Sequence, residues 1–267
     1  MSESKGNPKV EAIRQAWQQR QRIRDRLSGV RNKVAVYSGK GGVGKTTIAV
    51  NLACLLAWKG HRVGVLDADI DCPNVARVLR ATEPPVQENG KLIPSEAFGV
   101  KVVSMAFFQP NEEEAIIWRG PMIHKAITEL LEATEWGEME FLLVDLPPGT
   151  SDAPLTVMQT LPLDGFVVVT TPQELALLDA KRSVNMVRKM DVKVLGVVEN
   201  FEGEVFGSGA GEELARELDV PFLGSFSLRP DYRNNSGPTV LVSEPVRREY
   251  EAVLAALRKG LENLKKG

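Results

Sequence analysis

The stretch that decides the fold is Gly39-Lys40-Gly41-Gly42-Val43-Gly44-Lys45-Thr46, which follows the apolar run Val34 to Tyr37 and precedes a helical segment. Its spacing fits Gly-x-x-x-x-Gly-Lys-Ser/Thr, the pattern of a phosphate-binding loop between a strand and a helix. Glycines let the backbone turn tightly and direct N–H groups at phosphate oxygens, and the dipole of the following helix adds positive potential. The sequence therefore predicts a site for a nucleoside triphosphate.

Three side chains of this loop have expected tasks. We expect Lys45 to bridge the β- and γ-phosphates and the Thr46 hydroxyl to coordinate Mg²⁺. Lys40 is an additional cation that the ordinary phosphate cradle does not need, so it either lies idle in solvent or contacts phosphate from an unusual direction. The expected ATP-binding residues of the loop are Gly39, Lys40, Gly41, Gly42, Val43, Gly44, Lys45, Thr46 and Thr47.

Short apolar runs alternate with helical segments along the rest of the chain. Most runs are continuously apolar, which is typical of strands covered by helices on both faces. This pattern predicts an α/β fold with a doubly wound, mostly parallel sheet of the P-loop NTPase type, with its ligands beyond the carboxyl ends of the strands. The expected strands are Val34 to Tyr37, Val63 to Leu66, Val100 to Ser104, Phe141 to Val144, Phe166 to Val169 and Val194 to Val198.

Polar side chains follow three of these runs. Asp145 ends an apolar strand in the Walker B arrangement, so we expect it in the magnesium shell. Asp67 and Asp69 follow the second run, where carboxylates can hold Mg²⁺ through water or orient an attacking water; Asp67 is the candidate on the metal side. Gly149, in the turn after Asp145, could sense the γ-phosphate through its N–H. Asn200 could bond the adenine edge or form an Asx turn.

Residues 39–47 resemble the deviant Walker A loop of the MinD, ParA and ArsA class. The resemblance implies that Lys40 reaches across a dimer to the partner's nucleotide and that Asp69 orients the attacking water. Lys40, Lys45 and Asp69 are therefore the expected catalytic residues.

Further motifs together resemble the Mrp/ApbC family of iron–sulfur cluster carrier ATPases. That resemblance implies an ATP-dependent homodimer that holds a cluster between its subunits and passes it to apo-proteins. The motifs are Val36-Tyr37-Ser38, Asp67-Ala68-Asp69-Ile70, Ile117-Trp118-Arg119-Gly120-Pro121-Met122, Asp145-Leu146-Pro147-Pro148-Gly149-Thr150, Thr170-Thr171-Pro172-Gln173 and Val197-Val198-Glu199-Asn200.

One segment departs from the family pattern. Members usually carry a Cys-x-x-Cys pair after the Glu-Asn step, whereas this chain has Phe201 to Gly207 without cysteine. Thiolates are the usual ligands of iron–sulfur clusters, so the departure puts the cluster, though not the ATPase, in question. Cys72 is the remaining candidate: two copies in a dimer could offer soft ligands to nickel, zinc or a cluster. The alternative is a small buried residue before Pro73, and Cys54 is expected in the core.

The two ends of the chain are expected to be helical. Residues 1–31 form a predicted basic amphipathic extension, with a helix between Lys9 and Leu27, and residues 32–267 the ATPase domain. The extension is either a solvated helix or an arm that docks a partner or swaps in a dimer. An apolar stripe from Val246 to Leu264 predicts a last helix that packs on the sheet, with a membrane-surface helix as the alternative.

Composition limits the functional classes. The 267 residues carry a net charge of −2, which gives no global attraction to nucleic acid, and contain two cysteines, which fits a reducing compartment. The start lacks the apolar core of a signal peptide, and no run is long enough to span a membrane. We therefore expect a cytoplasmic ATPase without nucleic-acid or membrane partners.

The leading functional hypothesis is an ATP-hydrolysing homodimer in iron–sulfur or other metallocofactor assembly, with an apo-metalloprotein or a maturation factor as client. A HypB-like ATPase for nickel insertion into hydrogenase is one alternative. A MinD- or ParA-like positioning ATPase on membrane or DNA is the other.

Overall fold

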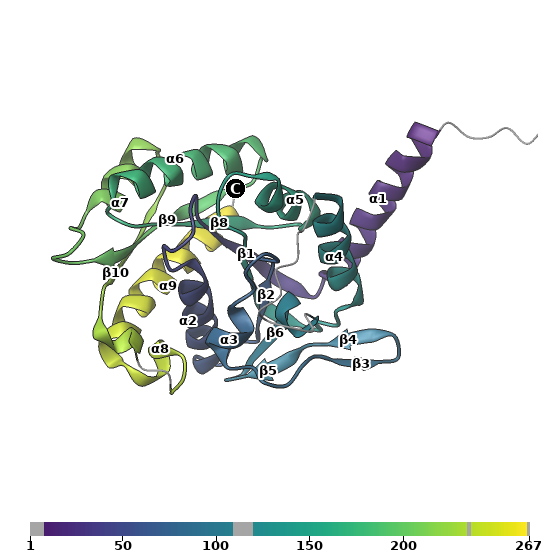
Figure 1. Ribbon diagram of the computed structural model, residues 1–267, viewed down its shortest axis with the longest axis horizontal. Helices are drawn as coiled ribbons and strands as arrows, with labels where there is room; N and C mark the ends of the chain where they lie inside the picture. The colour runs from purple at the N-terminus through teal and green to yellow at the C-terminus, as the bar shows by residue number, and fades with distance from the viewer. Residues whose placement is uncertain (1–7, 109–119, 234–235, 266–267) are drawn as a thin grey trace, which may run out of the picture.

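The computed structural model describes residues 8–108, 120–233 and 236–265. Its centre is an eight-stranded sheet in the order β10-β9-β8-β1-β7-β2-β6-β5, with helices on both faces (Figure 1). All neighbouring strands are parallel except β5, which pairs antiparallel with β6. The predicted doubly wound, mostly parallel sheet is therefore confirmed.

The strands of the main sheet are β1 (Val30–Tyr37), β2 (Val63–Asp67), β5 (Ser95–Ala97), β6 (Val100–Ser104), β7 (Met139–Asp145), β8 (Gly165–Thr170), β9 (Val194–Glu202) and β10 (Phe222–Ser227). A separate hairpin consists of β3 (Val86–Glu88) and β4 (Lys91–Ile93).

The helices are α1 (Pro8–Arg26), α2 (Lys45–Trp58), α3 (Val75–Leu79), α4 (Gly120–Ala133), α5 (Asp152–Thr160), α6 (Glu174–Lys189), α7 (Ala210–Glu217), α8 (Thr239–Val242) and α9 (Glu244–Leu264). Two short 3₁₀ helices are Met105–Phe108 and Pro230–Arg233.

The central strand β1 separates two apolar layers. Val34 and Val36 belong to the cluster that contains α2 and α9, whereas Ala35 and Tyr37 belong to the cluster beneath α4 and α5. All four are fully buried. Successive side chains of a strand point to opposite faces, so a continuously apolar strand is what two covering layers require.

All six predicted strands are present, but four others were missed. β10 carries Gly224 and two serines and is only partly buried at the sheet edge, so its pattern is not continuously apolar. β3, β4 and β5 have three residues each, too few to establish a period of two. The sequence signal therefore favoured strands with both faces covered.

The two terminal helices are covered to different extents. On α9 the predicted stripe is buried at Val246, Tyr250, Val253, Leu257 and Leu261, so packing on the sheet is confirmed over the membrane-surface alternative. On the helix α1, Ile23 and Leu27 are buried, whereas Trp17 is 66% exposed. No helix among the described residues has the length and apolar character to cross a membrane.

Candidate functional site

The glycine loop follows β1 at the carboxyl edge of the sheet and leads into α2, as the sequence predicts. Gly42 and Gly44 have φ angles of 81° and 85°, in the left-handed region that favours glycine. A Cβ atom on Gly44 would lie 2.2 Å from the Asn200 amide nitrogen, whereas one on Gly42 would meet nothing within 4 Å. Open space in front of the loop leaves its backbone free to approach a ligand closely.

The remaining loop residues pack against neighbouring elements. A Cβ on Gly39 would lie 2.2 Å from the Asp179 carbonyl oxygen on α6, and one on Gly41 would lie 3.9 Å from Pro148. The Val43 side chain is buried in the core. Thr47 accepts a hydrogen bond at its carbonyl from Asn51 Nδ2, at 2.8 Å. The loop thus lies between the turn after β7 and helix α6.

Three predicted residues meet at its base. Lys45 Nζ lies 2.6 Å from Asp145 Oδ1, and Thr46 Oγ1 donates to Asp145 Oδ2 at 2.6 Å. Asp145 is fully buried, and Lys45 is 6% exposed. Hydroxyl and carboxylate oxygens are the ligands that Mg²⁺ prefers, so Thr46 and Asp145 suit the predicted metal, and Lys45 places a fixed cation beside them.

Asp67 pairs in register with Asp145 on the adjacent strand. Its carboxylate accepts hydrogen bonds from Ser104 Oγ at 2.8 Å, Val75 N–H at 3.0 Å and Asp69 N–H at 3.3 Å. Burial, followed by the charge of Asp145, raises the pKa of Asp67. Asp67 therefore anchors the segment after β2 in this structure, and its place in the magnesium shell stays a prediction.

Asp69 lies between that anchor and Lys45. Its Oδ2 atom is 3.7 Å from Lys45 Nζ, and its Oδ1 atom accepts a hydrogen bond from Cys72 N–H at 3.4 Å. Burial raises the pKa of Asp69 to about 6, and the charge of Lys45 opposes that rise. Asp69 is thus a carboxylate beside the loop's cation, and its water-orienting role stays a prediction.

Two further predictions concern groups around the loop. Lys40 Nζ donates to Gln173 Oε1 at 3.4 Å within the same chain. The Gly149 N–H, expected to sense a γ-phosphate, donates to Ser38 O at 2.9 Å, and Gly149 O accepts from the Tyr37 hydroxyl at 2.5 Å. The switch role of Gly149 would therefore require this turn to release Ser38.

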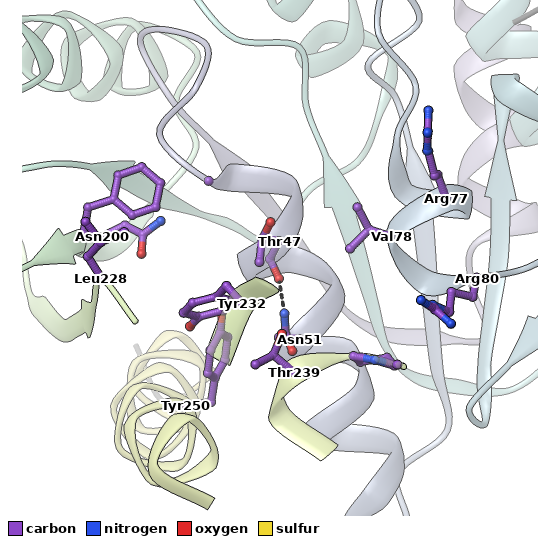
Figure 2. Close-up of a pocket in the computed structure, with 14 residues that line it drawn as sticks. Thr47, Asn51, Arg77, Val78, Arg80, Asn200, Leu228, Tyr232, Thr239 and Tyr250 are labelled. Atoms are coloured by element: carbon purple, nitrogen blue, oxygen red, sulfur yellow. Dashed lines mark hydrogen bonds between the residues drawn. The ribbon is translucent and has the colours of Figure 1, made fainter. Parts of the chain in front are cut away.

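A cavity of about 490 Å³ lies beside the loop and α2, and Figure 2 shows the residues that line it. Asn200 reaches it from the end of β9 and donates from Nδ2 to Val43 O at 2.8 Å, so it braces the loop rather than closing an Asx turn. Its contact with adenine stays a prediction. The lining residues are Gly44, Thr47, Asn51, Arg77, Val78, Arg80, Asn200, Phe201, Leu228, Tyr232, Gly237, Pro238, Thr239 and Tyr250.

Sequence reasoning missed several of these residues. Asn51 carried a signal, because it is a polar residue in an apolar run of the helix after the loop. It is 1% exposed, and its Oδ1 accepts from Val240 N–H at 2.8 Å, which fixes α8 beside the cavity. Arg77, Arg80 and Tyr232 come from α3, its C-terminal end and the segment after β10, so only the fold brings them together.

The cysteines divide as follows. Cys54 is buried on α2, as predicted, and burial raises its pKa to about 12. Cys72 is exposed, so the alternative of a buried residue is wrong: Cys72 lies in the turn between β2 and α3, outside the core. In the described part of the chain, no group of three or more histidine, cysteine and acidic residues could hold a metal ion.

The family motif at residues 117–122 is only partly described, because residues 117–119 lie outside the described residues.

Comparison with known proteins identifies the family of the chain. The model of the ParA family described as NUBPL iron-transfer P-loop NTPase matches residues 29–260. An iron-sulfur cluster carrier protein of Methanococcus maripaludis is 41% identical over 265 residues, covering 93% of this chain and 91% of that relative. One of Aquifex aeolicus is 41% identical, covering 87% of this chain and 68% of that relative.

Solved structures agree on the architecture. A nucleotide-binding protein of Archaeoglobus fulgidus in complex with ADP has a TM-score of 0.71 and 35% identity, covering 82% of this chain and 91% of that one. The cell division ATPase MinD of Pyrococcus furiosus has a TM-score of 0.65 and 22% identity, covering 87% and 99%, and shows the shared fold alone.

Proposed function

Because the chain belongs to the ParA family of NUBPL iron-transfer P-loop NTPases, we propose that it is an ATP-hydrolysing dimeric switch that serves metallocofactor assembly or delivery. The observation that carries this proposal is the convergence of Lys45, Thr46 and Asp145 at the base of the glycine loop. This arrangement supports the proposal because it brings one cation, one hydroxyl and one carboxylate together beside the phosphate-binding loop.

Nucleotide binding is the first step of the proposed cycle. The loop N–H groups and Lys45 bind the phosphates. The phosphate oxygens thereby compete with the Asp145 carboxylate for the Lys45 ammonium group. Thr46 and Asp145 would hold Mg²⁺, which would neutralise phosphate charge when bound. The cavity beside Asn200 has room for the nucleoside. ADP in the Archaeoglobus relative supports this assignment.

Hydrolysis requires a positioned water and charge stabilisation. Asp69 accepts a hydrogen bond from the attacking water, because its carboxylate lies 3.7 Å from Lys45 and above pH 6 is mostly ionised. Lys40 stabilises phosphate charge on the partner's nucleotide, which requires it to leave Gln173 as the dimer forms. Dimerisation is thereby coupled to turnover.

The cargo of the switch is a metal centre for an apo-metalloprotein or maturation factor. Relatives named iron-sulfur cluster carrier proteins support this class of cargo. The usual Cys-x-x-Cys is absent from Phe201 to Gly207, so an inter-subunit cluster needs other ligands. Cys72 is the proposed one, since it is exposed and bonded through its N–H to Asp69. Nickel delivery of the HypB kind would use the same soft ligand.

Anaerobic purification of the wild type and Cys72→Ser, with and without ATP, tests the cargo. Elemental analysis should find iron, nickel or zinc in the wild type and a loss in Cys72→Ser, with equal ATPase activity. Equal metal in both proteins would remove Cys72 from the proposal.

ATPase assays over a hundredfold range of protein concentration test the dimer, because specific activity should rise with concentration.

A positioning ATPase on a membrane is less well supported. The apolar stripe of α9 that could have bound lipid lies against the sheet, with Tyr250 stacked on Phe226 at 4.1 Å between ring centroids. Sedimentation with vesicles in the presence of ATP would reveal such an activity.

A further inference from the structure

The helix α1 extends beyond α4 and has two opposite faces (Figure 1). Its inner face contacts α4 and the segment that follows it: Arg22 Nε lies 3.1 Å from Glu132 Oε1 on α4, and Arg26 Nη1 lies 3.2 Å from Glu135 Oε2 just after α4. Ile23, on the same side, is 1% exposed. These contacts hold the C-terminal half of α1 against the rest of the protein. The opposite side of the helix therefore points toward solvent.

The outer face of α1 carries four exposed basic or aromatic residues, Arg14, Trp17, Arg20 and Arg24, beside the exposed Gln21. At about 100° per residue, the three arginines lie within about 60° of Trp17 around the helix axis and opposite the face that meets α4. All four residues are exposed, Trp17 by 66%. Arg14, Arg20 and Arg24 form no ion pair with any described residue, and the face is about 15 Å long.

Charge is strongly segregated between this helix and the rest of the chain. Residues 8–26 carry six basic and two acidic side chains, a net charge of +4, while the whole chain carries −2. The remainder therefore carries −6. A binding surface for the outer face must be locally acidic, and a long polyanion would meet repulsion from the body.

Residue types on the outer face identify the kind of partner. Tryptophan and arginine are enriched among the residues that dominate protein–protein binding energy, and arginine matches carboxylates with two parallel hydrogen bonds. An exposed helix with a large apolar anchor is suited to a groove on another protein. We propose that the outer face of α1 docks into a carboxylate-lined groove of a partner protein, with Trp17 in an apolar pocket.

Other occupants fit the face less well. A second copy that presented the same outer face would bring two faces of like charge together, which is unfavourable. Nucleic acid and anionic lipid are both negatively charged, so the body beside the helix, which carries −6, would repel them. None of Arg14, Trp17, Arg20 and Arg24 lines the cavity beside the glycine loop, so docking at this face does not depend on nucleotide chemistry.

Binding to defined probes tests the proposal. Fluorescence anisotropy would compare labelled 15-residue peptides that carry four glutamates around a Leu-Phe pair with the same peptides carrying glutamine. We expect at least about tenfold preference for glutamate, a loss of about tenfold in R20E/R24E, and no loss in the control R258E/K259E, which makes the same charge change on an exposed part of α9. Trp17→Ala should weaken binding yet keep the glutamate preference.

Circular dichroism would establish that each variant keeps its helix content, and R20Q/R24Q, a milder change, replaces R20E/R24E if that variant unfolds. Tighter binding to a 12-nucleotide single-stranded RNA, or to phosphatidylserine vesicles, with the same arginine dependence would overturn the protein-groove assignment. Binding of the acidic peptides that is equal in all variants, or absent in the wild type, would also overturn it.

Discussion

The glycine-loop edge of the sheet and the helix α1 both concentrate basic side chains, but they use them in opposite ways. At the loop, Lys45 is 6% exposed and lies 2.6 Å from a buried carboxylate. On α1, Arg14, Arg20 and Arg24 are exposed and have no ion pair with a described residue. A buried cation must be paired with an anion, so its position is fixed before a ligand binds. The charge of an exposed cation is screened by salt, and such a cation contributes mainly when a partner protein binds.

The largest effect should follow from Lys45→Ala. Loss of the fixed cation should weaken ATP binding by about 100-fold and turnover by roughly 1,000-fold, because charge-assisted contacts with phosphate disappear. Labelled-nucleotide titration and phosphate release measure the two quantities. Lys59→Ala, at the far end of α2, is the control; equal loss in both variants would place the effect in folding.

Asp69→Asn separates chemistry from binding. Removal of the water-orienting carboxylate should lower hydrolysis by about 100-fold while ATP affinity stays within about threefold, and the ATP dimer should accumulate. Single-turnover kinetics with size-exclusion chromatography would follow both. Asp71→Asn serves as control, since Asp71 is exposed. Normal turnover in Asp69→Asn would refute the assigned role.

Gly44→Ala and Gly42→Ala form a matched pair. Both positions have positive φ, but only at Gly44 would a Cβ meet Asn200. Backbone strain should cost about 1–3 kcal/mol in each, and Gly44→Ala should lose more because the brace to Val43 is displaced. Denaturant unfolding measures the difference. A smaller loss at Gly44 than at Gly42 contradicts the bracing role of Asn200.

A smaller effect is expected from Lys40→Ala. Nucleotide affinity of the monomer should be unchanged, while hydrolysis should fall by about tenfold and lose its dependence on protein concentration, because the cross-dimer contact is missing. Activity assays across concentrations measure this. If the activity of the variant depended on protein concentration as that of the wild type does, the cross-dimer role of Lys40 would be contradicted, and only its contact with Gln173 would remain.

The smallest effect should come from the other region. R20E/R24E on α1 should leave ATP turnover within about twofold, since neither residue lines the cavity beside the loop. Phosphate release at saturating ATP is the measurement. A large loss would show that α1 and the nucleotide edge are coupled, and the contrast between the two regions would fail.

The sequence predicted which residues meet at the base of the glycine loop, and it did so for a physical reason. Glycines, Lys45, Thr46 and Asp145 belong to short motifs whose spacing is set by backbone geometry, and the strands between them are continuously apolar. Asp67 shows the limit: its position after β2 was predicted, but its bonds to Ser104 and Val75 arise from chain segments far apart in sequence.

The cavity and the cysteines were harder to predict. Arg77, Arg80 and Tyr232 join Asn200 only after the strands have been ordered in the sheet, and no local period records that order. Exposure of Cys72 likewise depends on how the turn after β2 leaves the body. A strand that is covered on both faces appears in the sequence as a continuous apolar run, whereas a surface formed by several loops leaves no such local pattern.

Isothermal titration calorimetry with Mg²⁺ and ATP tests the central claim most directly, because the account rests on a triphosphate held by the loop between β1 and α2. It predicts one nucleotide bound per chain, with the heat greatly reduced in Lys45→Ala. Absence of heat with the folded wild type, or equal heat in both proteins, would contradict it.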